Sequence, residues 1–350
     1  MGLPTAWGAA AVTYKLACPL ARQNGLGARI TTCAVFFAVG TGLVLHVRRG
    51  LLRELQQIRR VAGAAQGVLL RPLPPRIDGL GLAAAQLSAD RGASVGGDLY
   101  EVIGTEHGVR IVMGDVRGHG LAAIGTVAAV LGSFREAVHD EAELTGVLRK
   151  MERALDRHLG ERAKAGHPSS GPDPDGTVAE EFVTVLLLEI GRDGGMRALN
   201  CGHPWPYLLR ADEHRAGARP GARPGARGRV EPLGSGDPMP PLGPFPLPGE
   251  LAAVPCGLLL PGDALFLYTD GVEDARDGAG RFFPLAATLA EATGTRPACP
   301  QTVLGTVFTR LLDHTGGPPT DDVALLVLRN DRDEPPAPPQ LEHMTHHSTL

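Results

Sequence analysis

The stretch VMGDVRGHGLAAI, residues 112–124, runs from an apolar strand through an acid and a glycine-rich loop into a helix of small residues. Asp115 ends the predicted strand, and Gly118 and Gly120 follow in the loop. An aspartate at a strand end is often a turn former or a helix cap, and that role accounts for Asp115 by itself. It does not account for the loop, which is too rich in glycine to hold itself rigid. The rest of the chain favours a second interpretation, in which backbone and side chain approach a ligand there.

Three further acids stand at the ends of predicted strands, each beside a glycine or a second acid: Asp98 in VGGDLY, Asp270 in YTDGV and Asp321 in TDDVALL. If the strand ends bring the carboxylates of the four motifs together, they repel one another unless a cation neutralises them. Arg117 is the only Lys or Arg within these motifs. Hard divalent cations prefer oxygen donors, and the neighbouring glycines allow a carbonyl such as that of Val116 to join the carboxylates. The pattern is compatible with a two-metal hydrolase, although spacing alone does not single one out.

Short apolar runs separated by Gly, Asp and Asn predict several strands. The turn Asp193–Gly195, between two such runs, is a hairpin signal. Helical spacing covers residues 121–160, and one further helix is predicted over 285–315. Strands and helices come in blocks and not in strict alternation, which indicates an α+β fold with antiparallel sheets. The strands are predicted within LGLAAAQLSA (80–89), GGDLYEVIGTEHGVRIVMGDV (96–116), FVTVLLLEIGRDGGMRALNCG (182–202), PYLLR (206–210), ALFLYTDGV (264–272) and PPTDDVALLVLRN (318–330).

Composition bounds the class of protein. The 350 residues, 43% of them hydrophobic, are enough for one large domain or two small ones. A formal net charge of −4 gives no reason to expect nucleic acid as a partner. The cysteines are odd in number and scattered, so we expect no disulfide framework, no zinc site and a reducing compartment. They are Cys18, Cys33, Cys201, Cys256 and Cys299.

Residues 30–47, ITTCAVFFAVGTGLVLHV, contain no Asp, Glu, Lys or Arg. The run is just long enough to span a bilayer as a helix, and we predict a single-pass membrane anchor there. Basic residues are more numerous after the run than before it, which predicts that the catalytic part lies in the cytoplasm. A signal peptide is disfavoured because no small-residue cleavage site follows, and a buried helix of a cytoplasmic protein is the alternative. The basic residues compared are Lys15, Arg22 and Arg29 before the run and Arg48, Arg49, Arg53, Arg59 and Arg60 after it.

An apolar residue recurs every three or four positions from Leu51 to Leu69, which predicts one stripe on a linker helix. The stripe either packs on the chain's own domain or pairs two copies into a weak homodimer. Pro72 and the prolines after it stop the helix. The resulting segments are an N-terminal segment (1–29), a transmembrane helix (30–47), a linker helix (48–77), a folded domain (78–329) and a disordered tail (330–350).

Two polar insertions are predicted in the folded domain, at residues 160–179 and 216–229. The second, AGARPGARPGARGR, carries four arginines and no acid. It is either a solvated loop or a basic segment that contacts anionic lipid or a phosphoprotein.

The motifs VGGDLY, GDVRGHG, NCGHPWP and YTDGVEDAR, in this order over residues 78–329, resemble the SpoIIE-type branch of the metal-dependent (PPM-type) serine/threonine protein phosphatases. The resemblance implies an α-β-β-α sandwich, in which helices flank two antiparallel sheets, with a pair of Mn²⁺ or Mg²⁺ ions at one edge. It implies hydrolysis of phosphoserine or phosphothreonine by attack of a water molecule that the two ions activate. The implied substrate is a phosphorylated regulatory protein such as an anti-sigma-factor antagonist.

The resemblance also implies roles for the residues that match its motifs. Asp115 would bridge both ions, and the carbonyl of Val116 would bind one of them. Asp98 would hold the second ion directly or through water, while Asp270 and Asp321 would hold the first.

Two residues of the glycine-rich loop are candidates for catalytic contact with the phosphate group. His119 would act as general acid toward the leaving serine oxygen, or else it fixes the glycine turn by a hydrogen bond to the backbone. Arg117 has a guanidinium that suits phosphate geometry, and it stands where the family often has an uncharged residue. We expect Asp322 to orient its neighbour and His203 to shape a turn.

A rival function comes from another class: a non-catalytic, membrane-tethered scaffold that binds a phosphoregulator. A scaffold needs no metal, so metal binding distinguishes the two functions. A two-metal nucleotide hydrolase is less favoured, because the sequence contains no phosphate-cradling P-loop.

Overall fold

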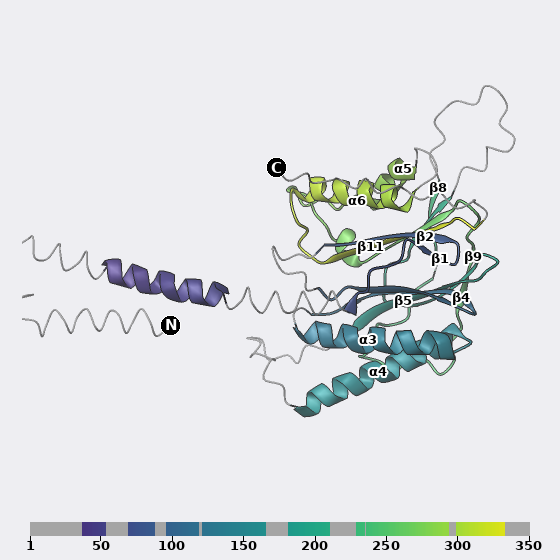
Figure 1. Cartoon of the computed structure of the whole chain (residues 1–350), viewed down its shortest axis with the longest axis horizontal. Helices are drawn as coiled ribbons and strands as arrows, with labels where there is room; N and C mark the ends of the chain where they lie inside the picture. Colours follow the sequence, from purple (N-terminus) through teal and green to yellow (C-terminus); the bar gives the residue numbers. More distant parts are fainter. Residues whose placement is uncertain are drawn as a thin grey trace, which may run out of the picture. The chain divides into compact units, whose positions relative to one another are not determined.

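The computed structural model describes most of the chain (Figure 1). The chain divides into two units, Met1–Val61 and Ala62–Leu350. The described residues are 37–53, 69–87, 96–118, 121–165, 181–210, 229–234, 236–293 and 299–332.

Five strands form one antiparallel sheet of the second unit, in the order β3-β4-β5-β6-β9. Its inner strands are apolar on both sides: along β5, Leu187 packs toward helices and Leu188 toward the other sheet. The hairpin predicted at Asp193–Gly195 is confirmed, because β5 and β6 pair on either side of it and Gly194 has a φ of +83°. The strands are β3 (Leu99–Thr105), β4 (Gly108–Val116), β5 (Val183–Ile190), β6 (Gly195–Cys201) and β9 (Val254–Leu258).

Six strands form the second antiparallel sheet, in the order β1-β2-β11-β10-β7-β8. The sequence patterns did not predict β8 or β9, because both are edge strands whose exposed residues hide the usual alternation. Arg229, the last residue of the predicted insertion 216–229, is the first residue of β8. The strands are β1 (Arg76–Ile77), β2 (Leu80–Leu87), β7 (Tyr207–Arg210), β8 (Arg229–Pro232), β10 (Ala264–Tyr268) and β11 (Val323–Asn330), and the 3-10 turn η3 (Asp270–Val272) follows β10.

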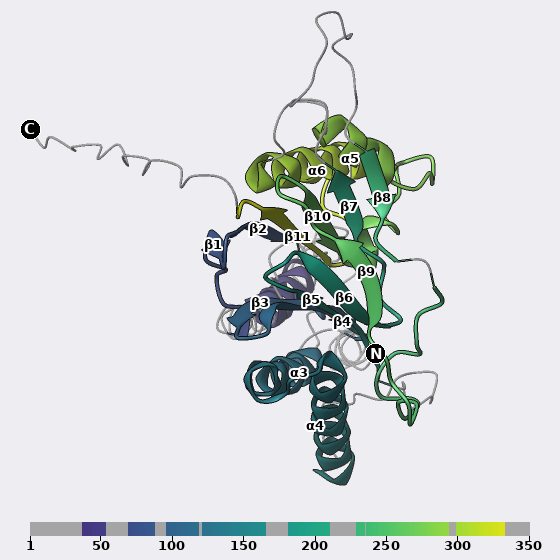
Figure 2. The same cartoon turned by 90° about the vertical axis from the view of Figure 1, so that its right-hand side faces the viewer.

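Helices cover the outer faces of both sheets, so the second unit has the predicted order of helices, sheet, sheet and helices (Figures 1 and 2). The pair α3 and α4 packs on the five-stranded sheet, and α5 and α6 pack on the six-stranded sheet. The prediction of one helix over 285–315 is wrong, because two helices occupy this range. The second begins at Pro300, which suits the first turn of a helix but not its interior. The helices are α3 (Leu121–Asp140), α4 (Leu144–Ala165), α5 (Leu285–Thr293) and α6 (Pro300–Thr315).

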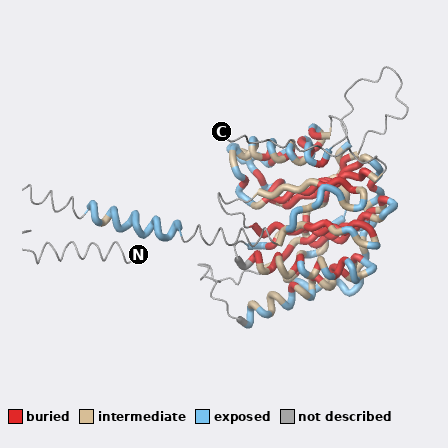
Figure 3. Tube along the Cα trace, viewed as in Figure 1, coloured by how far each residue is buried: buried red, intermediate tan, exposed pale blue. Residues whose placement is uncertain are grey.

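Three layers of buried apolar side chains hold the sandwich together. In Figure 3, buried residues (red) are concentrated along the strands of the two sheets. One layer lies between the α3–α4 pair and the five-stranded sheet, one between the sheets, and one between the six-stranded sheet and the α5–α6 pair. Because the inner strands are buried on both faces, a slip of one residue would exchange the two faces. The register of each inner strand therefore decides which side chain enters which core.

A buried arginine connects the five-stranded sheet to the turn between α3 and α4. Arg110 on β4 is fully buried and pairs with Glu189, its neighbour across the strands, at 2.8 Å. Its guanidinium also donates hydrogen bonds to the carbonyls of Val138, Glu141 and Ala142. A helix cannot satisfy its own last carbonyls, so this side chain supplies the missing donors.

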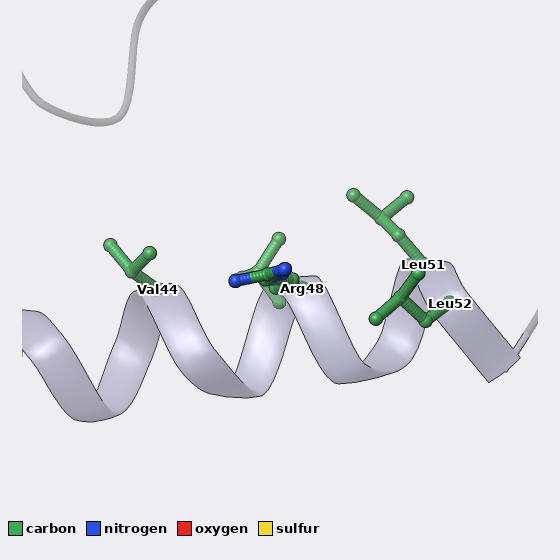
Figure 4. A pocket seen from close by; sticks show the side chains of 5 residues that line it. Val44, Arg48, Leu51 and Leu52 are labelled. Carbon is green, nitrogen blue, oxygen red and sulfur yellow. The ribbon is translucent and has the colours of Figure 1, made fainter. Parts of the chain in front are cut away.

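In the first unit, residues 37–53 form one continuous helix. Val44, Arg48, Leu51 and Leu52 lie along it (Figure 4). Val44 is 57% exposed and Leu51 56%, so this face of the helix is open to solvent.

The predicted membrane anchor lies partly outside the described residues. Among those that are described, no helix has the length and apolar character needed to cross a membrane. Residues 30–36 of the predicted anchor and 54–68 of the predicted linker helix lie outside the description.

Candidate functional site

Five aspartates at the strand ends of both sheets lie close enough to interact electrostatically. Asp98 stands directly before β3 and Asp115 is the penultimate residue of β4, so both belong to the five-stranded sheet. Asp270 opens η3, and Asp321 and Asp322 directly precede β11, in the six-stranded sheet. The structure therefore brings the four predicted acids together and adds Asp322, which we had expected only to orient its neighbour.

Burial and mutual repulsion raise the pKa of three of these carboxyls. Asp98 is 1% exposed, and burial, followed by the charges of Asp115 and Asp322, raises its pKa well above the ordinary value. The pKa of Asp115 is raised to about 7 by burial and by the charges of Asp270 and Asp321. Burial and the charge of Asp321 raise the pKa of Asp270 as well. A bound cation would relieve all of these penalties.

Glycines let the acid-bearing loops approach one another. The N–H of Val116 donates a hydrogen bond to the carbonyl of Gly97 at 3.1 Å. A Cβ atom at position 97 would lie 2.7 Å from Oδ1 of Asp115 and would clash with the carbonyl oxygen of Val116. A Cβ at Gly271 would clash with the carbonyl oxygen of Asp322. The backbone of the turn after β10 therefore packs directly against the backbone just before β11.

The donors of this cluster suit a hard divalent cation. All are oxygens, supplied by the five carboxylates and by the Val116 carbonyl, and Mg²⁺ and Mn²⁺ prefer such donors. In the described part of the chain, no three Asp, Glu, His or Cys side chains are gathered closely enough to hold a metal ion as they stand. The fit rests on the oxygen chemistry, on the repulsion between the carboxylates and on the close approach of Asp115 and the Val116 carbonyl to Gly97.

The loop after β4 carries the two candidates for phosphate contact. Arg117 is exposed, and its guanidinium carbon lies 5.2 Å from the centre of the Phe182 ring. The backbone N–H of Arg117 donates a hydrogen bond to the carbonyl of Phe182 at 2.9 Å. This bond fixes the start of the loop against the beginning of β5. His119 lies outside the described residues, so its role as general acid stays a prediction.

Behind Asp115 lies a buried polar chain that the sequence analysis missed in part. The N–H of Asp115 donates to Oγ1 of Thr184 at 3.1 Å, and this oxygen lies 3.1 Å from Nδ1 of His203. The side chain of Asn200 bonds both the N–H and the carbonyl of His203, which agrees with the predicted turn-shaping role. Full burial lowers the pKa of His203 to about 3, although the backbone of Tyr268 opposes this. The one sequence signal for Thr184 was a single hydroxyl in a strand whose other residues, apart from Glu189, are apolar.

A second buried threonine, Thr269, lies beside Asp98 and was also missed. Its Oγ1 donates to Oδ2 of Asp98 at 3.1 Å. The residue stands in the YTDGV motif, directly before Asp270, but no local pattern indicates that it reaches the residue before β3 of the other sheet.

Comparison with known proteins gives a family and a fold. The family model described as stage II sporulation protein E (SpoIIE) matches residues 105–331, well over half of the chain. The SiaA-PP2C domain of Pseudomonas aeruginosa is similar with a TM-score of 0.58 at 18% identity, over 80% of this chain and 98% of that one. The RsbU and RsbW domains of a Mycobacterium tuberculosis protein give a TM-score of 0.53 at 24% identity, over 74% of this chain and 62% of that one.

A further solved structure contains the PP2C phosphatase domain and a regulatory fragment of SpoIIE from Bacillus subtilis. It gives a TM-score of 0.51 at 15% identity, over 73% of this chain and 64% of that one. This chain thus spans less than two thirds of the Mycobacterium and Bacillus structures. At these identities the three structures share the fold of two antiparallel sheets between helices.

Proposed function

This chain belongs to the SpoIIE family of phosphoprotein phosphatases, and from that premise we propose that it hydrolyses phosphoserine or phosphothreonine on a regulatory protein with two divalent cations. One observation carries the proposal: carboxylates from both sheets lie close together, and burial, followed by the charges of Asp270 and Asp321, raises the pKa of Asp115 to about 7. Divalent cations would neutralise such a cluster, and in a two-metal phosphatase they would also activate the attacking water.

Two Mn²⁺ or Mg²⁺ ions, when bound, would lower the pKa of a water molecule and polarise the phosphoryl oxygens. Asp115 would hold both ions, and the carbonyl of Val116 would hold one. Asp98 would hold the second ion directly or through water. Asp270 and Asp321 would hold the first from the six-stranded sheet.

Two residues of the loop after β4 would act on the phosphate itself. Arg117, exposed and two positions beyond Asp115, would bind phosphoryl oxygens, since a planar guanidinium can donate two parallel hydrogen bonds. His119 would donate a proton to the leaving serine oxygen, which avoids release of an alkoxide.

For the substrate we propose a phosphorylated regulator of bacterial partner switching, such as an anti-sigma-factor antagonist. The similar Mycobacterium protein carries RsbU and RsbW domains in one chain, which supports this class. We further propose that residues 30–47 anchor the protein in the membrane and that the stripe beginning at Leu51 pairs two copies. Leu51, the first residue of this stripe, is 56% exposed on the helix 37–53, which is compatible with such pairing.

The test is Mn²⁺-dependent hydrolysis of an aryl phosphate and of a phosphoserine protein by the full-length chain. Asp115→Asn should lower kcat/KM by at least about 100-fold without changing the circular dichroism spectrum, because a neutral amide binds cations poorly. Asp313→Asn, at an exposed position of α6, is the control and should keep wild-type activity. Turnover by Asp115→Asn in chelator would contradict the two-metal assignment. A wild-type protein that binds its phosphoprotein without metal or turnover would instead be the scaffold.

A further inference from the structure

Thr269 joins β10 to the turn that carries Asp270. Its side chain is fully buried, and its N–H donates to the carbonyl of Ala324 on β11 at 3.1 Å. It is the N-cap of η3, with φ −89° and ψ 160°. A threonine in this position ordinarily turns its hydroxyl back onto an N–H of the helix, but Thr269 makes no such bond. Its hydroxyl therefore serves another partner.

That hydroxyl makes two hydrogen bonds to residues of different sheets. Oγ1 accepts the N–H of Ala324 at 2.8 Å and lies 3.1 Å from Oδ2 of Asp98. An N–H group can only donate, so the hydroxyl proton is free to point at the carboxylate. Ala324 belongs to the six-stranded sheet, whereas Asp98 precedes the first strand of the five-stranded sheet. One hydroxyl thus ties the acid-bearing ends of the two sheets together.

The carboxylate of Asp98 lies inside the protein, with the residue 1% exposed, so the groups packed against it set its orientation. The hydroxyl of Thr269 is one of these groups, because it donates to Oδ2 at 3.1 Å. With Oδ2 held, the carboxylate cannot rotate freely, so the direction of its second oxygen is set as well.

We propose that Thr269 is a positioning residue of the metal centre, whose hydroxyl fixes the carboxylate of Asp98 relative to Asp270. The oxygens contributed by the two sheets are then held in place before a divalent cation arrives. This inference rests on the proposed function. Hydrogen-bond partners of metal ligands commonly change metal affinity by about 10- to 100-fold, so the effect is measurable.

The experiment measures Mn²⁺ binding to the full-length, metal-free protein by calorimetry, with no substrate present. Thr269→Val keeps the shape of the side chain but removes its hydroxyl, and Thr269→Ser keeps the hydroxyl. Thr288→Val is the matched control, because Thr288 is a buried threonine of α5 whose hydroxyl donates to the carbonyl of Pro284 at 3.0 Å. Circular dichroism checks that each variant is folded.

We expect Thr269→Val to weaken Mn²⁺ binding about 10-fold or more, and Thr269→Ser to bind within about 3-fold of wild type. Thr288→Val should lose stability but keep its Mn²⁺ affinity. The concentration of Mn²⁺ that gives half-maximal activity should rise in Thr269→Val alone. If Thr269→Val does not fold, Thr269→Cys, with its weaker S–H donor, replaces it and should also weaken binding.

Equal Mn²⁺ affinity in folded Thr269→Val and Thr288→Val would overturn the inference and leave the proposed function standing. An equal loss in Thr269→Ser and Thr269→Val would also overturn it, because the hydroxyl would then not be the cause. Failure of the wild-type protein to bind Mn²⁺ would overturn the proposed function itself.

Discussion

The α-carbon of Gly97 lies so close to Asp115 that a Cβ atom there would come within 2.7 Å of Oδ1. The same Cβ would clash with the carbonyl oxygen of Val116, whose own N–H is bonded to the carbonyl of Gly97. A carboxylate and a backbone carbonyl can therefore share one small space only while position 97 has no side chain.

Gly97→Ala should weaken Mn²⁺ activation about 10-fold or more, because the added methyl group displaces both oxygens. The measurement is the Mn²⁺ dependence of kcat/KM, with urea unfolding in parallel. Gly132→Ala on α3 is the matched control: its Cβ meets nothing within 4 Å, and it should stabilise the helix by roughly 0.5–1 kcal/mol. A wild-type Mn²⁺ response in Gly97→Ala would contradict the assignment of these two oxygens.

His203 should make the metal-free protein sensitive to acid. Its pKa is lowered to about 3 in the folded state, below the usual 6.5 expected on unfolding. Above pH 6.5 both states hold a neutral ring, and as the pH falls toward 3 only the unfolded state takes up a proton. The contribution of His203 to the free energy of unfolding should then fall by up to about 1.4 kcal/mol per pH unit in this window.

Thermal melts between pH 7.5 and 4.5 in chelator measure this effect. Acidification should lower the melting temperature of the wild type relative to that of His203→Gln, which keeps a polar side chain but cannot titrate. Both proteins share the opposite contribution of Asp115, whose raised pKa favours the folded state as the pH falls. His139→Gln, at an exposed position of α3, should keep the wild-type slope. Parallel slopes in wild type and His203→Gln would rule out this contribution.

Arg110→Met should destabilise the protein by roughly 3–5 kcal/mol, because Glu189 stays buried after losing this partner and three carbonyls near the α3–α4 turn lose their donor. Urea unfolding at neutral pH measures the change. Arg281→Met removes the exposed ion pair with Asp277 and should cost less than about 1 kcal/mol. If the two variants lose similar amounts, the buried pair contributes little.

The full-length protein should sediment with membranes and cross-link as a dimer, whereas a shortened chain that begins at Ala62 should do neither. The shortened chain keeps Leu69, whose carbonyl accepts a hydrogen bond from Arg135 on α3 at 2.5 Å. Fractionation followed by cross-linking tests both points. Full-length protein in the soluble fraction would disprove the anchor, and identical cross-linking of both chains would disprove pairing through the linker.

Local patterns predicted the elements well, and contacts between distant residues poorly. The hairpin at Asp193–Gly195 and the acid after β10 follow from neighbouring residues alone. The bond between Thr269 and Asp98 joins residues 171 positions apart and depends on how the two sheets stack, which no periodicity encodes. The break before Pro300 was missed for the opposite reason: apolar spacing on both sides outweighed a proline that was visible in the sequence.

Arg210, the last residue of β7, pairs with Arg229, the first residue of β8. The chain therefore leaves the sheet and returns to it at this one pair. Leu209 lies opposite Ala264 and Tyr207 opposite Phe266, so the pair sits at the end of β10 that is remote from Asp270. Added length there costs little loop-closure entropy and moves no proposed ligand. We therefore expect insertions between Arg210 and Arg229 to be tolerated. A fluorescent reporter inserted there should leave the proposed metal ligands in place.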